Sequence, residues 1–454
     1  MWNLASKRNI LSSPRGLYLL VACVWAIALA GLFYLAVREV RDASMDFLSY
    51  YVGASAIEQG KPLYTLETHD SVLASIGIRM VGRYLYPPTL ALLMQPFLLV
   101  SPYAASLCWF FVNVGLVFLG VAFLLRQSDL RDHRMRAALL LLPVVFTPVL
   151  MTLYLGQVNI LIFMLIVLVW LAFVGGQRYT SGGVLALAVW IKLWPIILIA
   201  YFVWKREWKV VSGALIGLLL IGVLTFALAG DGQTISFFRE KLPEISRGTE
   251  PGIDHLNQSI PGVFAKMFAP RSNYVQPLIQ NPILAQQGSR LAALLLIGAT
   301  ILLSSRPIVL KDREQFSIEF MMVVIAAMLI TGRLFESNLT LLLPAYFFIA
   351  AKLQRERSTT WGQIALLVVS VMLIDLHRVI WTLANPDKQA LPWFLLIFPF
   401  LGAMLIWFIL AEMRLREIKA TEHSLLSEQS QPPLSSGATL LTTTRANKTE
   451  ERLP

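Results

Sequence analysis

The feature that most constrains this chain is a series of long apolar runs separated by short clusters of Lys and Arg. A membrane's hydrocarbon core needs about 20 apolar residues per helix, and many of the runs approach or exceed that length. Only 14% of the 454 residues are charged, against about 25% in soluble domains. The sequence therefore predicts an all-α integral membrane protein with about 11–13 transmembrane helices. The predicted segments are 16–37, 88–125, 137–153, 157–174, 182–203, 209–230, 290–304, 317–331, 338–351, 362–384 and 392–411.

Two of these segments contain internal breaks. Segment 88–125 is too long for one simple crossing, and Ser101-Pro102 predicts a break after a short first piece. Segment 182–203 carries Lys192 and Pro195 at its middle, which predicts two half-spanning helices.

The charge distribution predicts the orientation. Basic clusters at 126–136, 205–209, 306–313 and 352–357 should face the cytosol together with residues 1–15. The membrane domain is then 16–411, with outer loops 38–87 and 231–289 that bear short helices, and 412–454 is a cytosolic, largely disordered tail. This arrangement predicts a multi-pass protein of the cytoplasmic membrane. It also accounts for the net charge of +11 without a nucleic-acid partner.

Motifs for bound cofactors are absent from the sequence. It contains no P-loop, dinucleotide fingerprint, H-E-x-x-H motif or Asp-x-Asp motif. Cys23 and Cys108 both lie in apolar runs and form neither a disulfide framework nor a metal cluster. We therefore expect no metal and no cofactor.

The first outer loop carries the principal candidate for chemistry, Asp46. The residues from Met45 to Ile57 predict a short amphipathic helix that ends before Gly60 and Pro62. A carboxylate held there could take a proton from a bound hydroxyl group, as a general base does in an inverting sugar transfer. Alternatively, Asp46 only complements the helix dipole.

Lys192 is the second candidate. A lysine inside an apolar run is costly at membrane depth, which makes it a functional hypothesis. At the outer tip of two half-helices it could meet a phosphate; alternatively, its side chain snorkels to the interface.

Other polar motifs lie at the predicted outer face. Tyr86 of Arg83-Tyr84-Leu85-Tyr86-Pro87-Pro88 could stack on a sugar or lipid head group, or could belong to an ordinary interfacial segment. Gln157 and Asn159 could bind sugar hydroxyls or satisfy helix ends. The remaining polar groups are Asp254 to Ser259, Arg333 to Asn338, and a trio interpreted as structural, in which His377 and Arg378 could pair with Asp375.

In their order and spacing, six motifs resemble one family. They are Asp46-Phe47 with Tyr50-Tyr51, Leu63-Tyr64, Tyr86-Pro87-Pro88, Gly156-Gln157-Val158-Asn159, Lys192-x-Trp194-Pro195 and Asn257-Gln258-Ser259. Together they are similar to glycosyltransferase family 87, the polyprenyl-phosphate-mannose-dependent α-mannosyltransferases of the C-type superfamily. The resemblance covers roughly residues 15–410.

The resemblance implies a C-type glycosyltransferase fold whose site faces away from the cytosol, a polyprenyl-phosphate sugar donor and a lipid or glycan acceptor. The family's catalytic aspartate falls on Asp46. Lys192 would bind the donor phosphate with help from Arg83 or Arg333. The sugar- and acceptor-binding candidates are Tyr50, Tyr86, Gln157, Asn159, Trp194, His255, Asn257 and Gln258.

One departure from the family bears on the donor sugar. Before Leu341-Leu342-Leu343-Pro344, Ser337 and Asn338 occupy positions where members often carry histidines. His255 or Arg333 would then substitute, or the sugar or acceptor differs from the family's usual mannose chemistry.

The predicted function is inverting transfer of one sugar, mannose in the first instance, with Asp46 as general base. Two alternatives remain open. A transporter or flippase for a lipid-linked anion would share the helices and Lys192, but gives no reason for the helix at Asp46. A non-catalytic family member that binds polyprenyl phosphate would be consistent with Ser337 and Asn338.

Overall fold

The structure is a computed structural model of the chain. It describes residues 13–42, 46–78, 81–247, 254–306, 313–356, 361–384 and 389–429. The chain divides into two compact units after Arg414. The residues that line the cavity described below all belong to the first unit.

The described residues are helical almost throughout, which confirms the all-α prediction. The α-helices are α1 (Pro14–Asp42), α2 (Asp46–Glu58), α3 (Leu66–Ser75), α4 (Pro88–Leu93), α5 (Pro102–Gln127), α6 (His133–Val145), α7 (Thr147–Leu155), α8 (Asn159–Val174), α9 (Arg178–Ile191), α10 (Ile196–Trp204), α11 (Trp208–Ala229), α12 (Asp231–Ser236), α13 (Leu242–Arg247), α14 (Ile260–Phe268), α15 (Ser289–Leu303), α16 (Arg313–Leu329), α17 (Leu343–Glu356), α18 (Trp361–Ala384) and α19 (Phe398–Gln429). Shorter helical turns are η2 (Gln95–Leu99), η3 (Phe237–Lys241), η4 (Asp254–Leu256), η5 (Leu284–Gly288), η6 (Glu336–Leu342) and η7 (Trp393–Leu396). The strands β1 (Val275–Gln276) and β2 (Leu391–Pro392) pair in parallel.

Within the described residues, six helices are long and apolar enough to cross a membrane. A seventh span is possible if α6 and α7, which meet at 42°, form one bent crossing. Several other predicted segments fold as shorter helices, among them α8, α9 and α10. The protein is therefore a multi-pass membrane protein, while the larger number of crossings stays a prediction. The six helices are Pro14–Leu35, Pro102–Gln127, Trp208–Ala229, Leu284–Leu303, Gly362–Trp381 and Phe398–Thr421.

Both predicted breaks are present. Helix α5 begins at Pro102, with the Ser101 hydroxyl accepting a hydrogen bond from the Ala104 amide as its cap. Helix α9 ends at Ile191 and α10 begins at Ile196, so Lys192 lies in the interruption. At Lys192 the backbone is extended, with φ −149° and ψ 117°. Pro195 has no backbone N–H to donate to the Ile191 carbonyl oxygen, so it cannot extend α9.

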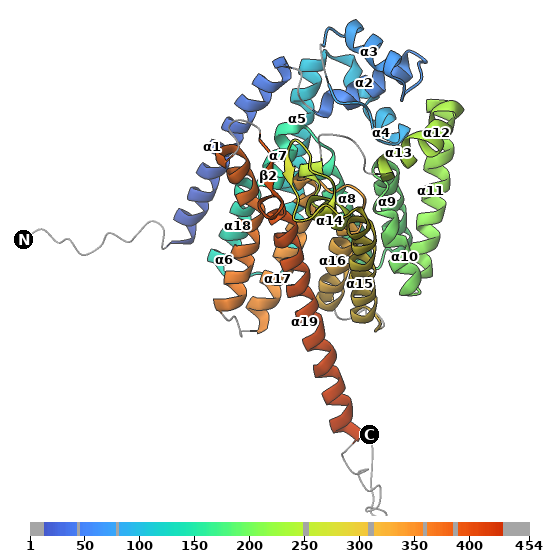
Figure 1. The fold of residues 1–454 in the computed structure, drawn as a ribbon. Helices are drawn as coiled ribbons and strands as arrows, with labels where there is room; N and C mark the ends of the chain where they lie inside the picture. The colour runs from blue at the N-terminus through green and yellow to red at the C-terminus, as the bar shows by residue number, and fades with distance from the viewer. Residues whose placement is uncertain are drawn as a thin grey trace, which may run out of the picture. The chain divides into compact units, whose positions relative to one another are not determined.

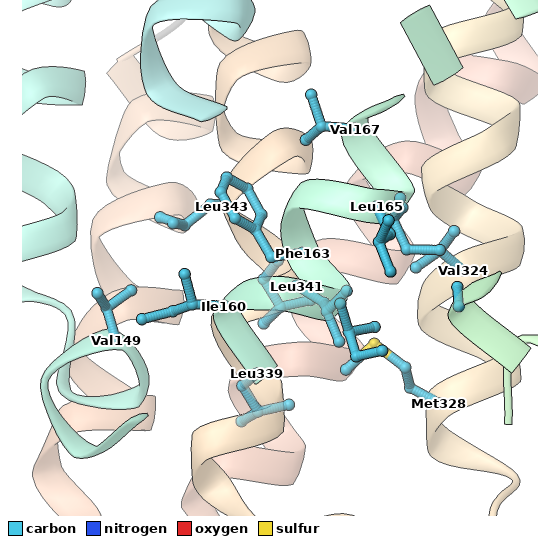
Figure 2. Packing of buried hydrophobic residues seen from close by; sticks show 14 of the residues in the cluster. Val149, Ile160, Phe163, Leu165, Val167, Val324, Met328, Leu339, Leu341 and Leu343 are labelled. Atoms are coloured by element: carbon cyan, nitrogen blue, oxygen red, sulfur yellow. The ribbon is translucent and has the colours of Figure 1, made fainter. Parts of the chain in front are cut away.

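The core surrounds α8, whose side chains are buried on nearly every face. Figure 2 shows Ile160, Phe163 and Leu165 of α8 near residues of α7, α16 and η6. Leu339, Leu341 and Leu343 supply one side of this packing, and each is at most 1% exposed. The segment that carries η6 is therefore held firmly, including the polar residues at its start.

Helices α9 and α11 approach each other through glycines. A Cβ at Gly182 would lie 2.0 Å from the carbonyl oxygen of Val210, and one at Gly213 would lie 2.3 Å from the carbonyl oxygen of Tyr179. Only glycine permits this approach, which resembles the small-residue contacts common between membrane helices. The close packing supports α9 up to the break at Lys192.

The helix of the first outer loop lies at the predicted place but is not amphipathic. The structure describes it from Asp46 to Glu58, and Met45 lies outside the described residues. Residues 47–56 are all buried, because α2 packs among α3, α4, α5 and η2 rather than along a surface. In the first unit, α2, α3, α4 and α12 gather at one end, and the C-terminal ends of α10, α15 and α17 lie at the other (Figure 1).

The predicted tail begins as helix. Helix α19 continues through residues 412–429, which we expected to be largely disordered, and residues 430–454 lie outside the described residues. The stretch from Ala411 to His423 is rich in Ala, Glu, Met, Leu, Lys and Arg and contains no Gly or Pro. These residues have high helix propensity, so the helix extends past the apolar run.

Candidate active site

A cavity of about 900 Å³ lies where residues from distant parts of the chain meet. The start of α2, the loop before α4, the turn between α7 and α8, the break after α9 and the start of η6 all contribute to it. The polar and charged residues that line it are Asp46, Ser49, Tyr50, Arg83, Tyr86, Gln157, Lys192, Trp194, Glu244, Thr331, Arg333, Glu336, Ser337, Asn338 and Arg378. The structure therefore places Asp46 and Lys192 on the same cavity.

Asp46 is the first residue of α2 and is partly buried. Its carboxylate accepts a short hydrogen bond from Nε2 of Gln157. Burial raises the pKa of the Asp46 carboxyl above its ordinary value of 3.8, while the hydrogen bond from Gln157 and the charge of Lys192 act in the opposite direction. A carboxylate with a raised pKa is a better proton acceptor than an exposed one.

The turn that presents Gln157 is set by glycine. Gly156 ends α7 with φ 68° and ψ 31°, a left-handed conformation that favours glycine. The backbone amide of Gln157 donates to the Thr152 carbonyl oxygen at 3.0 Å. The Trp109 indole donates to the Gly156 carbonyl oxygen at 2.7 Å. These bonds hold the backbone, so the Gln157 side chain projects toward Asp46.

Lys192 is held by two amide oxygens. Its Nζ donates to Oδ1 of Asn159 at 2.7 Å and to Oδ1 of Asn338 at 2.8 Å. Both acceptors are neutral, so the ammonium is oriented without being neutralised by a carboxylate in direct contact. An ammonium that lines a cavity in this state can bind an anion such as a phosphate.

A chain of hydrogen bonds joins the two candidates. Asn159 donates through Nδ2 to Oε1 of Gln157 at 2.7 Å, and Ser337 donates its hydroxyl to the same oxygen. Gln157 thus contacts Asp46 on one side and Asn159 on the other. Ser337 and Asn338 contact the two ends of this chain, Ser337 through Gln157 and Asn338 through Lys192.

The other predicted residues on the cavity are aromatic or basic. Tyr50 donates to the Tyr86 hydroxyl at 3.3 Å, with ring centroids 5.1 Å apart in an edge-to-face arrangement. Arg83, Arg333 and Trp194 also line the cavity. Their positions agree with the proposed roles in binding, which stay predictions.

Three predicted residues of the second outer loop are held elsewhere. Among the described residues, those that line the cavity do not include His255, Asn257 or Gln258. His255 is buried and stacks on Trp381 with ring centroids 4.5 Å apart. Asn257 donates to the Gly332 carbonyl oxygen at 2.8 Å, and Gln258 donates from its side chain to the Leu396 carbonyl oxygen at 3.0 Å. These contacts attach the loop to its neighbours, and sugar binding by the three residues stays a prediction.

The sequence did not single out Glu336 as a site residue. It lines the cavity and is 6% exposed. Its Oε2 lies 3.4 Å from Nδ1 of His377 and 3.4 Å from Nε of Arg378. The expected pairing of these two residues with Asp375 is wrong, because Asp375 instead accepts a hydrogen bond from the Thr147 amide at 2.9 Å. The charged segment from Arg333 to Asn338 was the only sequence signal for Glu336.

The fold and cavity define a multi-pass membrane protein with a polar site between broken helices. The profile of "Glycosyltransferase family 87" matches residues 84–332, which is more than half of the chain. The chain therefore belongs to glycosyltransferase family 87. Asp46, Ser337 and Asn338 lie outside the matched residues, and their place in the site comes from the cavity.

Curated relatives share modest identity with the chain. Over 233 residues it is 26% identical to a Mycobacterium tuberculosis protein named "Polyprenol-phosphate-mannose-dependent alpha-(1-2)-phosphatidylinositol mannoside mannosyltransferase". That match covers 48% of this chain and 53% of the relative. A protein of the same name from Mycolicibacterium smegmatis is 25% identical over 285 residues, with 58% and 62% covered.

A relative with a different named activity matches as well. The chain is 27% identical over 267 residues to "Alpha-(1->3)-arabinofuranosyltransferase" of Mycobacterium tuberculosis, with 57% of this chain and 58% of the relative covered. The matches thus span about half to three fifths of the relatives' length. No solved structure matches the chain.

Proposed function

We propose that this protein transfers one sugar from a polyprenyl-phosphate donor to a hydroxyl group of a lipid or glycan acceptor. The observation that carries the proposal is that Asp46 and Lys192 line one cavity and are joined through Gln157 and Asn159. A proton acceptor and an anion-binding cation are the two groups that such a displacement needs. The family supports the reaction class.

In the proposed reaction the acceptor oxygen attacks the anomeric carbon and its proton passes to Asp46. The bond between that carbon and the phosphate oxygen breaks, and polyprenyl phosphate leaves with the bonding electron pair. Lys192 stabilises the phosphate, assisted by Arg83 or Arg333. Direct displacement inverts the anomeric centre of the product.

Mannose is the proposed donor sugar. Two relatives are named for polyprenol-phosphate mannose, whereas another is named an arabinofuranosyltransferase. Ser337 and Asn338 line the cavity. The resemblance to the family implies histidines at these positions, so this wall would differ where a donor binds. Polyprenyl-phosphate arabinofuranose is therefore the second donor to test.

Sugar transfer in proteoliposomes tests the function. The substrates are radiolabelled polyprenyl-phosphate mannose and a membrane lipid extract, and the variants are wild type, Asp46→Asn and Asp70→Asn. Asp70 is an exposed aspartate of α3 that is not among the cavity-lining residues, so its variant is the matched control. Label should reach a new product with wild type and Asp70→Asn and fall by about 100-fold or more with Asp46→Asn.

Other outcomes would change the assignment. Equal transfer by wild type and Asp46→Asn would reject Asp46 as the base. Movement of intact labelled donor across the bilayer, without bond cleavage, would favour a transporter. Transfer from the arabinofuranose donor alone would reject mannose.

We further propose that the cavity opens on the extracytoplasmic side of the cytoplasmic membrane, because the basic clusters then lie in the cytosol. Cysteines introduced at Asp70 and Lys209, both exposed, report on the two sides in intact cells. A membrane-impermeant maleimide should label Asp70→Cys and leave Lys209→Cys unlabelled. The reverse pattern would place the cavity in the cytosol.

A further inference from the structure

Glu336 is a further carboxylate on the cavity, in addition to Asp46 and Glu244, and the proposed chemistry assigns it no role. It begins η6, one wall of the cavity, and is followed by Ser337 and Asn338. Its backbone segment is held because Leu339, Leu341 and Leu342 are at most 1% exposed. The position of the carboxylate is therefore set by the core rather than by a loose loop.

Among the described residues, one carboxylate oxygen of Glu336 has partners and the other has none. Oε2 lies 3.4 Å from both His377 Nδ1 and Arg378 Nε. Oε1 is buried and, among the described residues, has no hydrogen-bond partner. A buried hydrogen-bond acceptor without a partner costs about 1–3 kcal/mol. An unpartnered carboxylate oxygen beside a cavity is therefore suited to accept a hydrogen bond from a bound ligand.

The position of Glu336 within the cavity indicates which part of the ligand it would contact. In the proposed reaction the anomeric carbon lies between the acceptor oxygen at Asp46 and the phosphate at Lys192. The first turn of η6 contacts both ends, because Ser337 donates to Gln157 and Asn338 accepts from Lys192. A wall that spans the two ends borders the donor sugar, and sugar hydroxyls are hydrogen-bond donors that a carboxylate accepts.

We propose that Glu336 binds a hydroxyl group of the donor sugar through Oε1, with Arg378 and His377 holding the carboxylate in place. The proposal rests on the proposed function. It makes Glu336 a specificity-determining residue for the sugar, while Lys192 binds the phosphate that every polyprenyl-phosphate donor shares.

The test compares two ligands of the purified protein in nanodiscs: polyprenyl phosphate and polyprenyl-phosphate mannose. Glu336→Gln should weaken binding of the mannosyl donor by about 5- to 30-fold, because a hydrogen bond to a charged acceptor is roughly twice as strong as one to a neutral acceptor. Binding of polyprenyl phosphate should not change. Glu336→Asp, which keeps the charge but withdraws the oxygen by one methylene group, serves as the second variant in case Glu336→Gln folds poorly.

Two control variants accompany the test. Glu314→Gln alters a glutamate that also contacts two basic side chains, Lys352 at 3.1 Å and Arg355 at 2.8 Å, yet is not among the cavity-lining residues described. It should change neither affinity. Lys192→Gln should weaken the binding of both ligands, because both carry the phosphate.

The outcomes separate the two proposals. Unchanged affinities in both Glu336 variants, or an equal loss for both ligands, would overturn the role of Glu336 and leave the glycosyltransferase proposal standing. Failure of the wild-type protein to bind either lipid would overturn the proposed function itself. Selective loss of binding of the mannosyl donor would support both the role of Glu336 and the proposed function.

Discussion

Lys192 donates to Oδ1 of Asn338 at 2.8 Å, joining the break between α9 and α10 to the start of η6. The two residues are 146 positions apart in the chain. Asn338 lies in direct contact with the proposed phosphate-binding cation. The Asn338 side chain therefore bears on the proposed donor site itself.

Replacement of Asn338 by Asp tests this relationship. A carboxylate beside Lys192 would pair with its ammonium and repel a phosphate, and this effect is strong in a partly buried site. We expect Asn338→Asp to weaken binding of polyprenyl phosphate by about 10-fold or more. Asn338→Leu, which removes the acceptor without adding charge, should weaken it less. Equal effects of the two variants would argue against a phosphate at Lys192.

The pH dependence of transfer tests the general base. The carboxyl of Asp46 must lose its proton to act, so activity should fall as the pH drops through its pKa, which burial raises above 3.8. The Gln157 hydrogen bond stabilises the ionised form and lowers that pKa. Gln157→Leu should therefore move the acid limb of the pH–rate profile to higher pH. An acid limb that stays in place, or moves down, would reject Asp46 as the titrating base.

Contact between α9 and α11 should be sensitive to one methyl group. Gly182→Ala would place a Cβ against the backbone of α11, 2.0 Å from the Val210 carbonyl oxygen. We expect a loss of about 1–3 kcal/mol in stability, seen as a lower midpoint of thermal unfolding in detergent. The neighbouring Gly183 is the control, because its Cβ would meet nothing within 4 Å. Gly183→Ala should be neutral or stabilising, and a similar loss in both variants would contradict the packing argument.

A buried ionic cluster away from the cavity should contribute to stability. Glu319 contacts Lys205 at 2.7 Å and Arg414 at 2.9 Å, and all three side chains are at most 2% exposed. Glu319→Ala would leave two buried cations without this carboxylate, at a cost of about 3–5 kcal/mol. Arg355→Ala, which removes a 59% exposed ion-pair partner, should cost less than about 1 kcal/mol. Thermal unfolding of the two variants compares them, and equal midpoints would count against a stabilising cluster.

Much of the fold could be predicted from local sequence. The breaks at Ser101-Pro102 and at Lys192 follow from proline and from a charge within an apolar run. The failures have a physical cause in tertiary packing. Helix α2 was expected to be amphipathic, yet its small and aromatic residues are buried on all sides because α3, α4, α5 and η2 pack around it. Helix α19 continues past the apolar run because the residues that follow the run also have high helix propensity.

The sequence alone determined the class of protein, the candidates Asp46 and Lys192 and the turn that presents Gln157, since apolar length, proline, glycine and isolated charges act locally. Only the tertiary structure decided which polar residues meet. It brought Asn338 to Lys192, Ser337 to Gln157 and Glu336 to the cavity, while Asn257 and Gln258 were used in loop contacts. Side chains from distant segments meet only when the helices that carry them pack, and no local pattern encodes that packing.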